Sequence, residues 1–238
     1  MENKAYGNFL SHLTSYFDVV KLMDYRKETK KCLLRHDVDV SLSNALEMAE
    51  IEYSMDVEST YFVLHTAPYY GRGNFIDVCK KIQGMGHEIG LHSNVITSTI
   101  KEELNDPKTV LDRELSYLRE NDLEIHGTSS HGDPLCHQLE YVNYRIFKEC
   151  PPKRRKGSNI VKGVKLYKLS LKDYGLYEAY FIPYDCYISD PGGVWRTSKN
   201  NKLIKYTTEK IKKVIEKLGE DENVKTLQLL THPCWWRF

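Results

Sequence analysis

The sequence lacks several features that would point to particular classes of protein. No stretch approaches the roughly 20 consecutive apolar residues that a membrane-spanning helix needs. The start of the chain, Met1 to Gly7, has no apolar run of the kind found in a signal peptide. Glycine and proline are scarce, with 14 and 8 residues, which argues against a collagen-like or disordered chain. We therefore expect a soluble protein of the cytoplasm.

An excess of charge of one sign is also missing, because 34 lysines and arginines stand against 33 aspartates and glutamates. This balance argues against a protein that binds nucleic acid through bulk charge. The six cysteines are scattered and form no Cys-x-x-Cys pair. Without an export signal we expect them to be reduced thiols. The length of 238 residues fits one domain that covers residues 1–238.

Helical and strand patterns alternate along most of the chain. Apolar residues at helical spacing predict an amphipathic helix from Tyr6 to Tyr25, so residues 1–30 are expected to form an N-terminal helical extension. Strand–helix units that follow one another predict parallel strands with crossover helices, and therefore an α/β sheet or barrel. The expected strands cover residues 31–39, 59–65, 86–92, 124–129, 175–183 and 225–230, and the expected later helices cover 43–55, 75–83, 101–121 and 208–218.

Two carboxylates end the first predicted strand. Asp37 and Asp39 are two residues apart, so on an extended strand they point to the same side. Two carboxylates in such a place are costly unless they share a cation or a proton. An alternative is that Asp39 caps the following helix and that Asp37 is half-solvated. The residues at the other strand ends favour a functional role.

Four of the nine histidines end or follow predicted strands, where a parallel α/β fold gathers its chemistry. They are His65, His92, His131 and His232. One histidine at a strand end is more often a hydrogen-bonded structural group, but several that converge on a carboxylate pair predict a site for a divalent metal. His87 lies five residues before His92 and faces the opposite side of the strand, where we expect a structural role.

Four motifs occur in a fixed order along the chain. They are Arg35-His-Asp-Val-Asp39, Ser59-Thr-Tyr-Phe-Val63, Gly86-His-Glu-Ile-Gly-Leu-His-Ser93 and Leu229-Leu-Thr-His232. Together they resemble the polysaccharide deacetylase superfamily, also called the NodB-homology group or carbohydrate esterase family 4, over residues 32–233. The resemblance implies a distorted (β/α) barrel with mostly parallel strands. It also implies a metal-dependent hydrolase that removes an acyl group, usually acetyl, from an amino sugar.

The same resemblance implies roles for three residues. Asp37 corresponds to the general base, Asp39 to a metal ligand and His232 to the general acid. The chain departs from the metal-binding motif of the family, His-Ser/Thr-x-x-His, because Ile96 stands four residues after His92. Isoleucine cannot bind a metal, so either another histidine completes the site or the metal is lost.

We expect His131 to complete the site, with His65 as the second choice. The expected ligands of one divalent metal ion are then Asp39, His92 and His131. Zinc is the first choice for such a ligand set, and cobalt, nickel and iron also suit two nitrogens and one carboxylate.

Further residues are expected at the substrate, which is an amino sugar. They are Arg35, His65, Tyr69, Tyr70, Asp190 and Trp195. Arg35 also fits a role in holding Asp37 ionised, and Trp195 equally fits a core aromatic. The run Lys153-Arg-Arg-Lys156 is most simply a solvated loop, although a substrate that carries a diphosphate would suit it.

The expected function is removal of an N-acetyl group from an amino sugar, carried by a nucleotide or a lipid during assembly of a surface polysaccharide. Two other classes stay open. One is a non-catalytic carbohydrate-binding protein on the same scaffold, favoured by Ile96. The other is a metal-dependent phosphoesterase, whose clusters of carboxylates and histidines usually bind two metal ions. Binding of no ion, one ion or two ions per chain separates the three classes.

Overall fold

The computed structural model describes residues 3–26, 30–104, 106–155, 157–199 and 202–236. No helix in these ranges is both long and apolar enough to cross a membrane. The helices are α1 (Asn3–Thr14), α2 (Leu42–Ser54), α3 (Phe75–Gly84), α4 (Val95–Lys101), α5 (Pro107–Glu120), α6 (Pro134–Gln138), α7 (Leu171–Tyr174) and α8 (Thr208–Glu220). The strands are β1 (Asp18–Val20), β2 (Lys31–Val38), β3 (Thr60–Leu64), β4 (Glu88–Ser93), β5 (Ile125–Ser130), β6 (Ile160–Val161), β7 (Val164–Lys165), β8 (Tyr177–Glu178), β9 (Cys186–Ser189), β10 (Trp195–Lys199), β11 (Lys202–Tyr206) and β12 (Thr226–Thr231).

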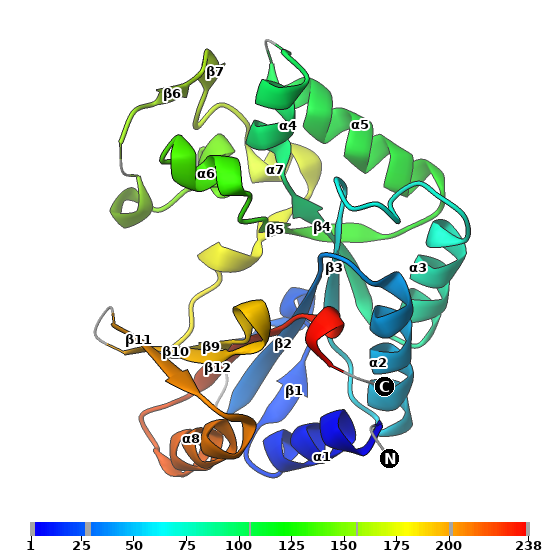
Figure 1. The fold of residues 1–238 in the computed structure, drawn as a ribbon, viewed down its shortest axis with the longest axis vertical. Coiled ribbons are helices and arrows are strands. Elements are labelled where there is room, and N and C mark those ends of the chain that lie inside the picture. The colour runs from blue at the N-terminus through cyan, green and yellow to red at the C-terminus, as the bar shows by residue number, and fades with distance from the viewer. Residues whose placement is uncertain (1–2, 27–29, 105, 156, 200–201, 237–238) are drawn as a thin grey trace. The chain divides into compact units, whose positions relative to one another are not determined.

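The main sheet has the strand order β11-β10-β9-β12-β2-β3-β4-β5-β8, and β1 pairs with β2 beside this path (Figure 1). The pairs of β12 with β2 and β9, of β4 with β5 and of β5 with β8 are parallel. Strand β10 is antiparallel to both β9 and β11. The prediction of an α/β fold with mostly parallel strands and an N-terminal helix is therefore confirmed.

The chain divides into two compact units. The first contains Met1–Tyr61, Asp77–Glu88 and Pro183–Phe238, and the second contains Phe62–Ile76 and Ile89–Ile182. Each unit takes its residues from separate stretches of the chain, as expected where parallel strands are joined by crossover helices.

The N-terminal segment of the first unit is helical over a shorter stretch than predicted. Helix α1 ends at Thr14, and Asp18–Val20 forms β1, which pairs in parallel with β2. The apolar residues Phe9, Leu10 and Leu13 are buried on one face of α1, as the helical spacing predicts. The prediction of a helix as far as Tyr25 is wrong because Val19 and Val20, which are β-branched, take a place beside β2 instead of a further helical turn.

The second unit differs from the sequence prediction in its longest helix. The helix expected over residues 101–121 begins only at Pro107, as α5, because α4 ends at Lys101 and the residues between them are not helical in the described part of the chain. Asp106 is the N-cap of α5, since its side chain accepts a hydrogen bond from the backbone N–H of Lys108 at 3.0 Å. Pro107 lacks an N–H and favours the first position of a helix, so α5 begins at this residue. The spacing of the apolar residues does not mark this boundary. The strand expected over residues 175–183 is reduced to β8 and a 3-10 turn at Ala179–Phe181.

A fully buried carboxylate lies in the core of the first unit. Glu52 of α2 accepts hydrogen bonds from Ser59 Oγ at 2.6 Å and from Tyr61 OH at 2.7 Å. His36 of β2 donates to it from Nε2 at 2.8 Å, and the hydroxyl of Tyr6 on α1 donates as well. The network thus joins α1, β2, α2 and β3 through one side chain.

The electrostatics of this network keep Glu52 charged and its tyrosine partners neutral. Burial alone would raise the pKa of the carboxyl, but the charge and hydrogen bond of His36 outweigh it and hold the pKa of Glu52 at about 2. Burial and the nearby Glu52 raise the pKa of Tyr6 and of Tyr61, so both hydroxyls remain donors. A buried charge of this kind is tolerable only while its hydrogen-bond partners are present.

We expect replacement of Glu52 to destabilise the protein strongly. Glu52→Ala leaves the donors around it unsatisfied and should lower the free energy of unfolding by about 3 kcal/mol, measured by urea denaturation. Glu50→Ala is the matched control, because Glu50 lies on the same helix and forms an exposed ion pair with Lys81 that is worth less than about 1 kcal/mol. If Glu52→Ala does not fold, Glu52→Gln should show the same effect in weaker form. Equal stability of the Glu52 and Glu50 variants would contradict this role.

The same carboxyl should also make the stability depend on pH. Because its pKa in the folded chain lies below the ordinary value of 4.5, its contribution is complete above about pH 4.5 and is lost as the pH falls towards 2. The stability difference between the wild type and Glu52→Gln should therefore shrink over this range.

Candidate active site

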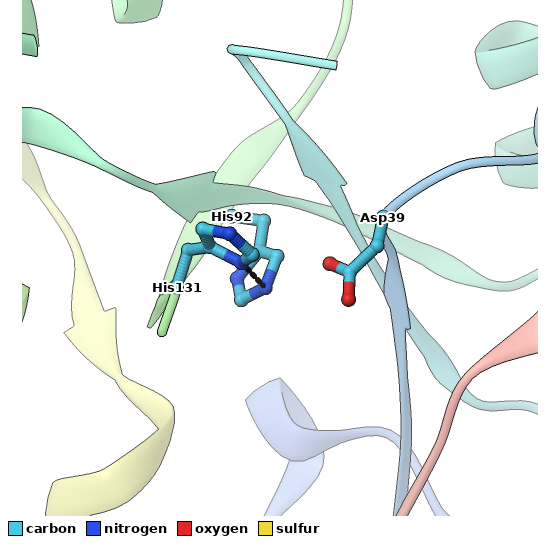
Figure 2. Close-up of side chains that lie close together, drawn as sticks. All are labelled: Asp39, His92 and His131. Carbon is cyan, nitrogen blue, oxygen red and sulfur yellow. Dashed lines mark hydrogen bonds between the residues drawn. The ribbon is translucent and has the colours of Figure 1, made fainter. Parts of the chain in front are cut away.

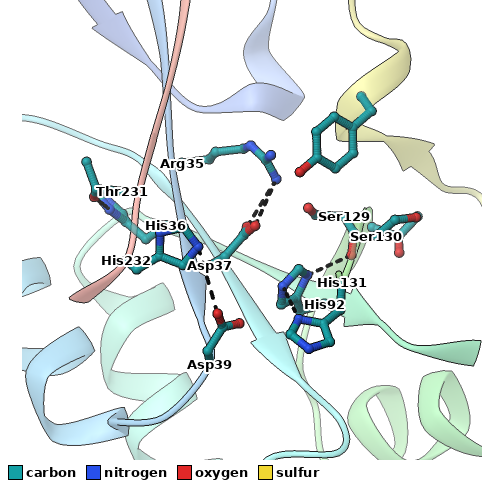
Figure 3. Close-up of polar contacts among 12 residues, drawn as sticks. Arg35, His36, Asp37, Asp39, His92, Ser129, Ser130, His131, Thr231 and His232 are labelled. Atoms are coloured by element: carbon teal, nitrogen blue, oxygen red, sulfur yellow. Dashed lines mark hydrogen bonds and ion pairs between the residues drawn. The ribbon is translucent and has the colours of Figure 1, made fainter. Parts of the chain in front are cut away.

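Strand β2 carries the candidate residues of the first unit with alternating orientation. Arg35 and Asp37 share one face, and Arg35 Nη1 donates to Asp37 Oδ1 at 3.0 Å (Figure 3). Both side chains are buried, so the half-solvated alternative for Asp37 does not apply. The guanidinium fixes the orientation of the carboxylate and balances its charge.

The opposite face of β2 holds the strand in place. Residue pairing puts His36 opposite Thr231 of β12, and His36 Nδ1 lies 2.6 Å from Thr231 Oγ1 (Figure 3). The other ring nitrogen of His36 binds Glu52. This anchoring of His36 fixes the register that turns Arg35 and Asp37 to the other side.

Asp39 follows the end of β2 and is not the cap of the next helix. Ser41 is the N-cap of α2, and its hydroxyl accepts a hydrogen bond from the N–H of Asn44 at 3.2 Å. The helix-cap alternative for Asp39 is therefore replaced by Ser41. Asp39 Oδ2 instead lies 3.8 Å from His232 Nε2 (Figure 3).

His232 follows β12 and is oriented by Asp190, which follows β9. Its Nδ1 donates to Asp190 Oδ1 at 2.7 Å, and its backbone N–H donates to Asp190 Oδ2 at 3.3 Å. The proton on Nδ1 leaves Nε2 as the ring nitrogen on the side of Asp39. Burial lowers the pKa of His232, but the hydrogen bond and the charge of Asp190 outweigh burial and raise it above its usual value. Such a histidine is suited to carry and deliver a proton at neutral pH.

The second unit supplies two imidazoles from neighbouring strands. His92 of β4 is paired with Ser129 of β5, and His131 follows the end of β5. His92 Nδ1 donates to the carbonyl oxygen of Ser129 at 2.8 Å, which leaves a lone pair on Nε2. That Nε2 lies 3.2 Å from His131 Nδ1 (Figure 2). The position of His131 is fixed by its backbone N–H, which donates to the carbonyl of Ser93 at 2.9 Å.

Asp39, His92 and His131 form a candidate metal-binding triad. Each offers one ligand atom, and these three atoms lie within 4.8 Å of one another (Figure 2). Two imidazole nitrogens and one carboxylate oxygen are a donor set that suits a catalytic metal ion, since three protein ligands leave a position open. The carbonyl of Ser129 sets the tautomer of His92 that metal binding requires. The residues therefore fit the ion that the sequence predicts.

Ile96 and His65 take no part in this triad. Ile96 is fully buried in α4, where its backbone N–H donates to Asn143 Oδ1 at 2.9 Å. His65 Nε2 accepts a hydrogen bond from the backbone N–H of Asn94 at 2.9 Å. Burial, followed by the positive charge of Arg113, lowers the pKa of His65 to about 3, so this histidine is neutral. The contacts of His65 are those of a structural residue of the second unit.

The aromatic residues expected at the substrate are packed against other rings. Tyr69 OH accepts a hydrogen bond from the N–H of Leu64 at 2.9 Å. The ring centre of Tyr70 lies 4.8 Å from that of Phe75 and 5.5 Å from that of Tyr117. These contacts describe an aromatic cluster within the second unit.

Trp195 lies in the core of the first unit, as its alternative interpretation anticipates. Its ring stacks on Phe9 with centres 5.0 Å apart, and its Nε1 donates to Thr208 Oγ1 at 3.3 Å. The sequence analysis did not single out Trp235, which lies in the 3-10 turn Pro233–Trp235 after His232. Trp235 is 51% exposed and packs against Gly193. The signal for it was its place three residues after a candidate catalytic histidine.

Removal of the His131 imidazole should weaken metal binding. We expect His131→Ala to weaken zinc affinity by at least about tenfold, measured by titration of the metal-free protein, because one of three ligand atoms is lost. His126→Ala, which changes an exposed histidine of β5, is the matched control and should bind about one zinc ion per chain. If His131→Ala keeps its zinc affinity and His65→Gln loses it, then His65 and not His131 is the third ligand.

A solved structure resembles the chain, whereas no family model and no curated protein matches it. The solved structure is the chitin deacetylase from the fungal pathogen Colletotrichum lindemuthianum, with 12% sequence identity and a TM-score of 0.43. The likeness covers 91% of this chain and 77% of that chain.

Proposed function

We propose that this chain is a metal-dependent hydrolase that removes an acyl group, usually acetyl, from the nitrogen of an amino sugar. The observation that carries the proposal is the Asp39, His92 and His131 triad, in which Asp39 also lies beside His232. A carboxylate held by Arg35 and an imidazole held by Asp190 add a base and an acid. Amide hydrolysis requires both of these groups together with a means to stabilise the oxyanion.

The triad would hold one divalent ion, with zinc as the first choice. When bound, such an ion polarises the acyl carbonyl and lowers the pKa of water. Cobalt, nickel and iron also suit this donor set.

Asp37 is the proposed general base. It removes a proton from the attacking water, and Arg35 keeps the carboxylate oriented while the proton moves. The guanidinium is fully buried, so its position is fixed by packing rather than by solvent.

His232 is the proposed general acid. Its Nε2 delivers a proton to the nitrogen of the departing amino sugar, which would otherwise be a very poor leaving group. Asp190 holds the ring through Nδ1 and stabilises the positively charged imidazole before the transfer. The raised pKa of His232 keeps a larger share of the ring protonated near neutral pH.

An amino sugar as substrate is supported by the exposed ring of Trp235. Aromatic faces stack on the apolar faces of sugar rings. Trp235 lies three residues after His232 and presents about half of its surface to solvent. Its place fits contact with the sugar that carries the leaving nitrogen.

Substitution of each aspartate in turn should distinguish the general base, Asp37, from the metal ligand, Asp39. We expect Asp37→Asn to keep about one zinc ion per chain while it lowers kcat on N-acetylglucosamine oligomers by about 10²-fold or more, measured as acetate release. Asp39→Asn should weaken zinc affinity as well, because it removes a ligand. Asp24→Asn, on the surface of the same unit, should change neither. Equal loss of zinc in Asp37→Asn and Asp39→Asn would show that the assigned roles are wrong.

The role of His232 can be tested by the choice of leaving group. We expect His232→Ala to lower kcat on an N-acetyl sugar by about 10²-fold or more, with folding and zinc content unchanged. An activated aryl ester needs no proton on its leaving group, so the variant should lose much less activity on that substrate. Equal losses on the amide and the ester, or no loss on either, would remove His232 from the mechanism. If the zinc-loaded wild-type protein hydrolyses neither the amide nor the ester, the hydrolase is rejected and a non-catalytic carbohydrate-binding protein is favoured.

A further inference from the structure

The second unit contains a cavity of about 480 Å³ that the proposed mechanism does not use. Its wall is formed by the segment that follows His131, and it includes His137, Glu140, Tyr144, Arg145, Lys153 and Arg154. A volume of this size is within the range of pockets that hold small ligands.

The lining of the cavity is strongly positive although the chain as a whole is nearly neutral. Arg145, Lys153 and Arg154 each carry a permanent positive charge, and Glu140 supplies a single negative charge. The formal net charge of the entire chain is +1. Three cations around one cavity therefore concentrate positive potential at a defined place, which attracts an anion.

Arg145 is the most informative of the three cations because it is only 3% exposed. Its Nε donates to Tyr167 OH at 2.7 Å, and its Nη2 donates to the carbonyl of Ser158 at 2.6 Å. Its Nη1 donates to the carbonyl of Glu140 at 3.3 Å. These neutral oxygens fix the guanidinium without cancelling its charge, and no carboxylate of the described residues forms an ion pair with it. A buried charge without a counter-charge is costly, and an anion in the cavity would offset that cost.

Lys153 and Arg154 add positive charge from the 3-10 turn Pro152–Arg154. The guanidinium of Arg154 lies 5.7 Å from the ring centre of Tyr144, a cation–π contact that keeps it at the cavity. Lys153 is exposed and forms no ion pair within the described ranges. Arg155 serves the loop instead, since it donates to the backbone carbonyls of Cys150 and Lys148. The basic run is therefore divided between the cavity and the loop, and Lys156 lies outside the described residues.

The wall of the cavity is joined by hydrogen bonds to the backbone of His131, one of the triad residues. Asn143 lies between the wall residues Val142 and Tyr144. Its Nδ2 donates to the carbonyl of His131 at 3.0 Å and to Asn94 Oδ1 at 3.0 Å. A ligand in the cavity is therefore held by the same unit that holds His92 and His131.

We propose that this cavity binds a diphosphate group. Arginine forms paired hydrogen bonds with phosphate oxygens, and lysine adds a point charge, so the three cations match a group with two or more negative charges. The ring of Tyr144 offers an apolar face to whatever the diphosphate carries. If the chain deacetylates an amino sugar, as proposed above, the diphosphate would belong to that substrate and would link the sugar to a nucleoside or to an isoprenoid lipid.

Inorganic pyrophosphate is the probe that tests the diphosphate site. Calorimetric titration of the full chain is carried out in EDTA, so that the probe cannot bind through a metal ion. We expect the double variant Lys153→Ala/Arg154→Ala to raise the Kd by at least about tenfold, because two charge-assisted contacts are lost. The control Lys165→Ala/Lys172→Ala removes the same charge from exposed positions of the same unit and should leave the Kd unchanged. The proposal fails if the wild type does not bind at millimolar pyrophosphate, or if both double variants lose affinity equally.

Two further probes distinguish the carriers of the diphosphate. Tighter binding of uridine diphosphate than of pyrophosphate supports a nucleotide carrier, and tighter binding of farnesyl diphosphate supports a lipid carrier. Equal affinity for all three supports a site that recognises the diphosphate alone. If both organic diphosphates bind more than about tenfold more weakly than pyrophosphate, the cavity cannot accept a substituted diphosphate and the proposal is overturned.

Failure of the diphosphate site can be distinguished from failure of the proposed deacetylase function. Pyrophosphate binding by a chain that releases no acetate from any N-acetyl sugar would reject the deacetylase and keep the anion site. Acetate release from N-acetylglucosamine oligomers by a chain that does not bind pyrophosphate would reject the anion site alone.

Discussion

The packing of the first unit depends on one buried carboxylate, that of Glu52, which must be surrounded by hydrogen-bond donors. Glu52 is surrounded by donors from a helix and two strands, and none of these elements can shift without exposing an unsatisfied charge. Because His36 is one of the donors, the register of β2 is part of the same constraint. A shift of one residue would turn His36 towards the reactive face and Asp37 towards Glu52. The stability of the core and the orientation of the candidate base therefore have a common physical origin.

Each candidate reactive group is held by a partner that fixes its chemical state. Arg35 pairs with Asp37, Asp190 with His232, and the carbonyl of Ser129 with His92. The partners are buried, so water does not compete with them and their geometry is retained when substrate enters. Each candidate group, at the end of a different strand, therefore has its own partner, and the base, the acid and the metal ligand can be held in different protonation states.

Much of the site could be predicted because its residues follow simple periodicities. The two-residue spacing of Asp37 and Asp39 and the strand-end position of His92 and His131 need only an extended strand and a parallel sheet. Pairings across long stretches of chain could not be predicted in the same way.

The role of Asp190 depends on a hydrogen bond across 42 residues to His232. The tautomer of His92 depends on a backbone oxygen, which no residue type reveals. Trp195 could be placed near the pocket from its neighbours in sequence, yet its ring stacks on α1, a contact that only the folded chain contains.

The place of His131 in the candidate triad has a consequence for α4, which follows His92. The side chain at position 96 is an isoleucine that is fully buried in α4. Burial of such a side chain stabilises a fold by about 1.5 to 3 kcal/mol. With His131 as a candidate ligand after the neighbouring strand β5, the site needs no nitrogen from α4, and the buried isoleucine at position 96 serves packing alone.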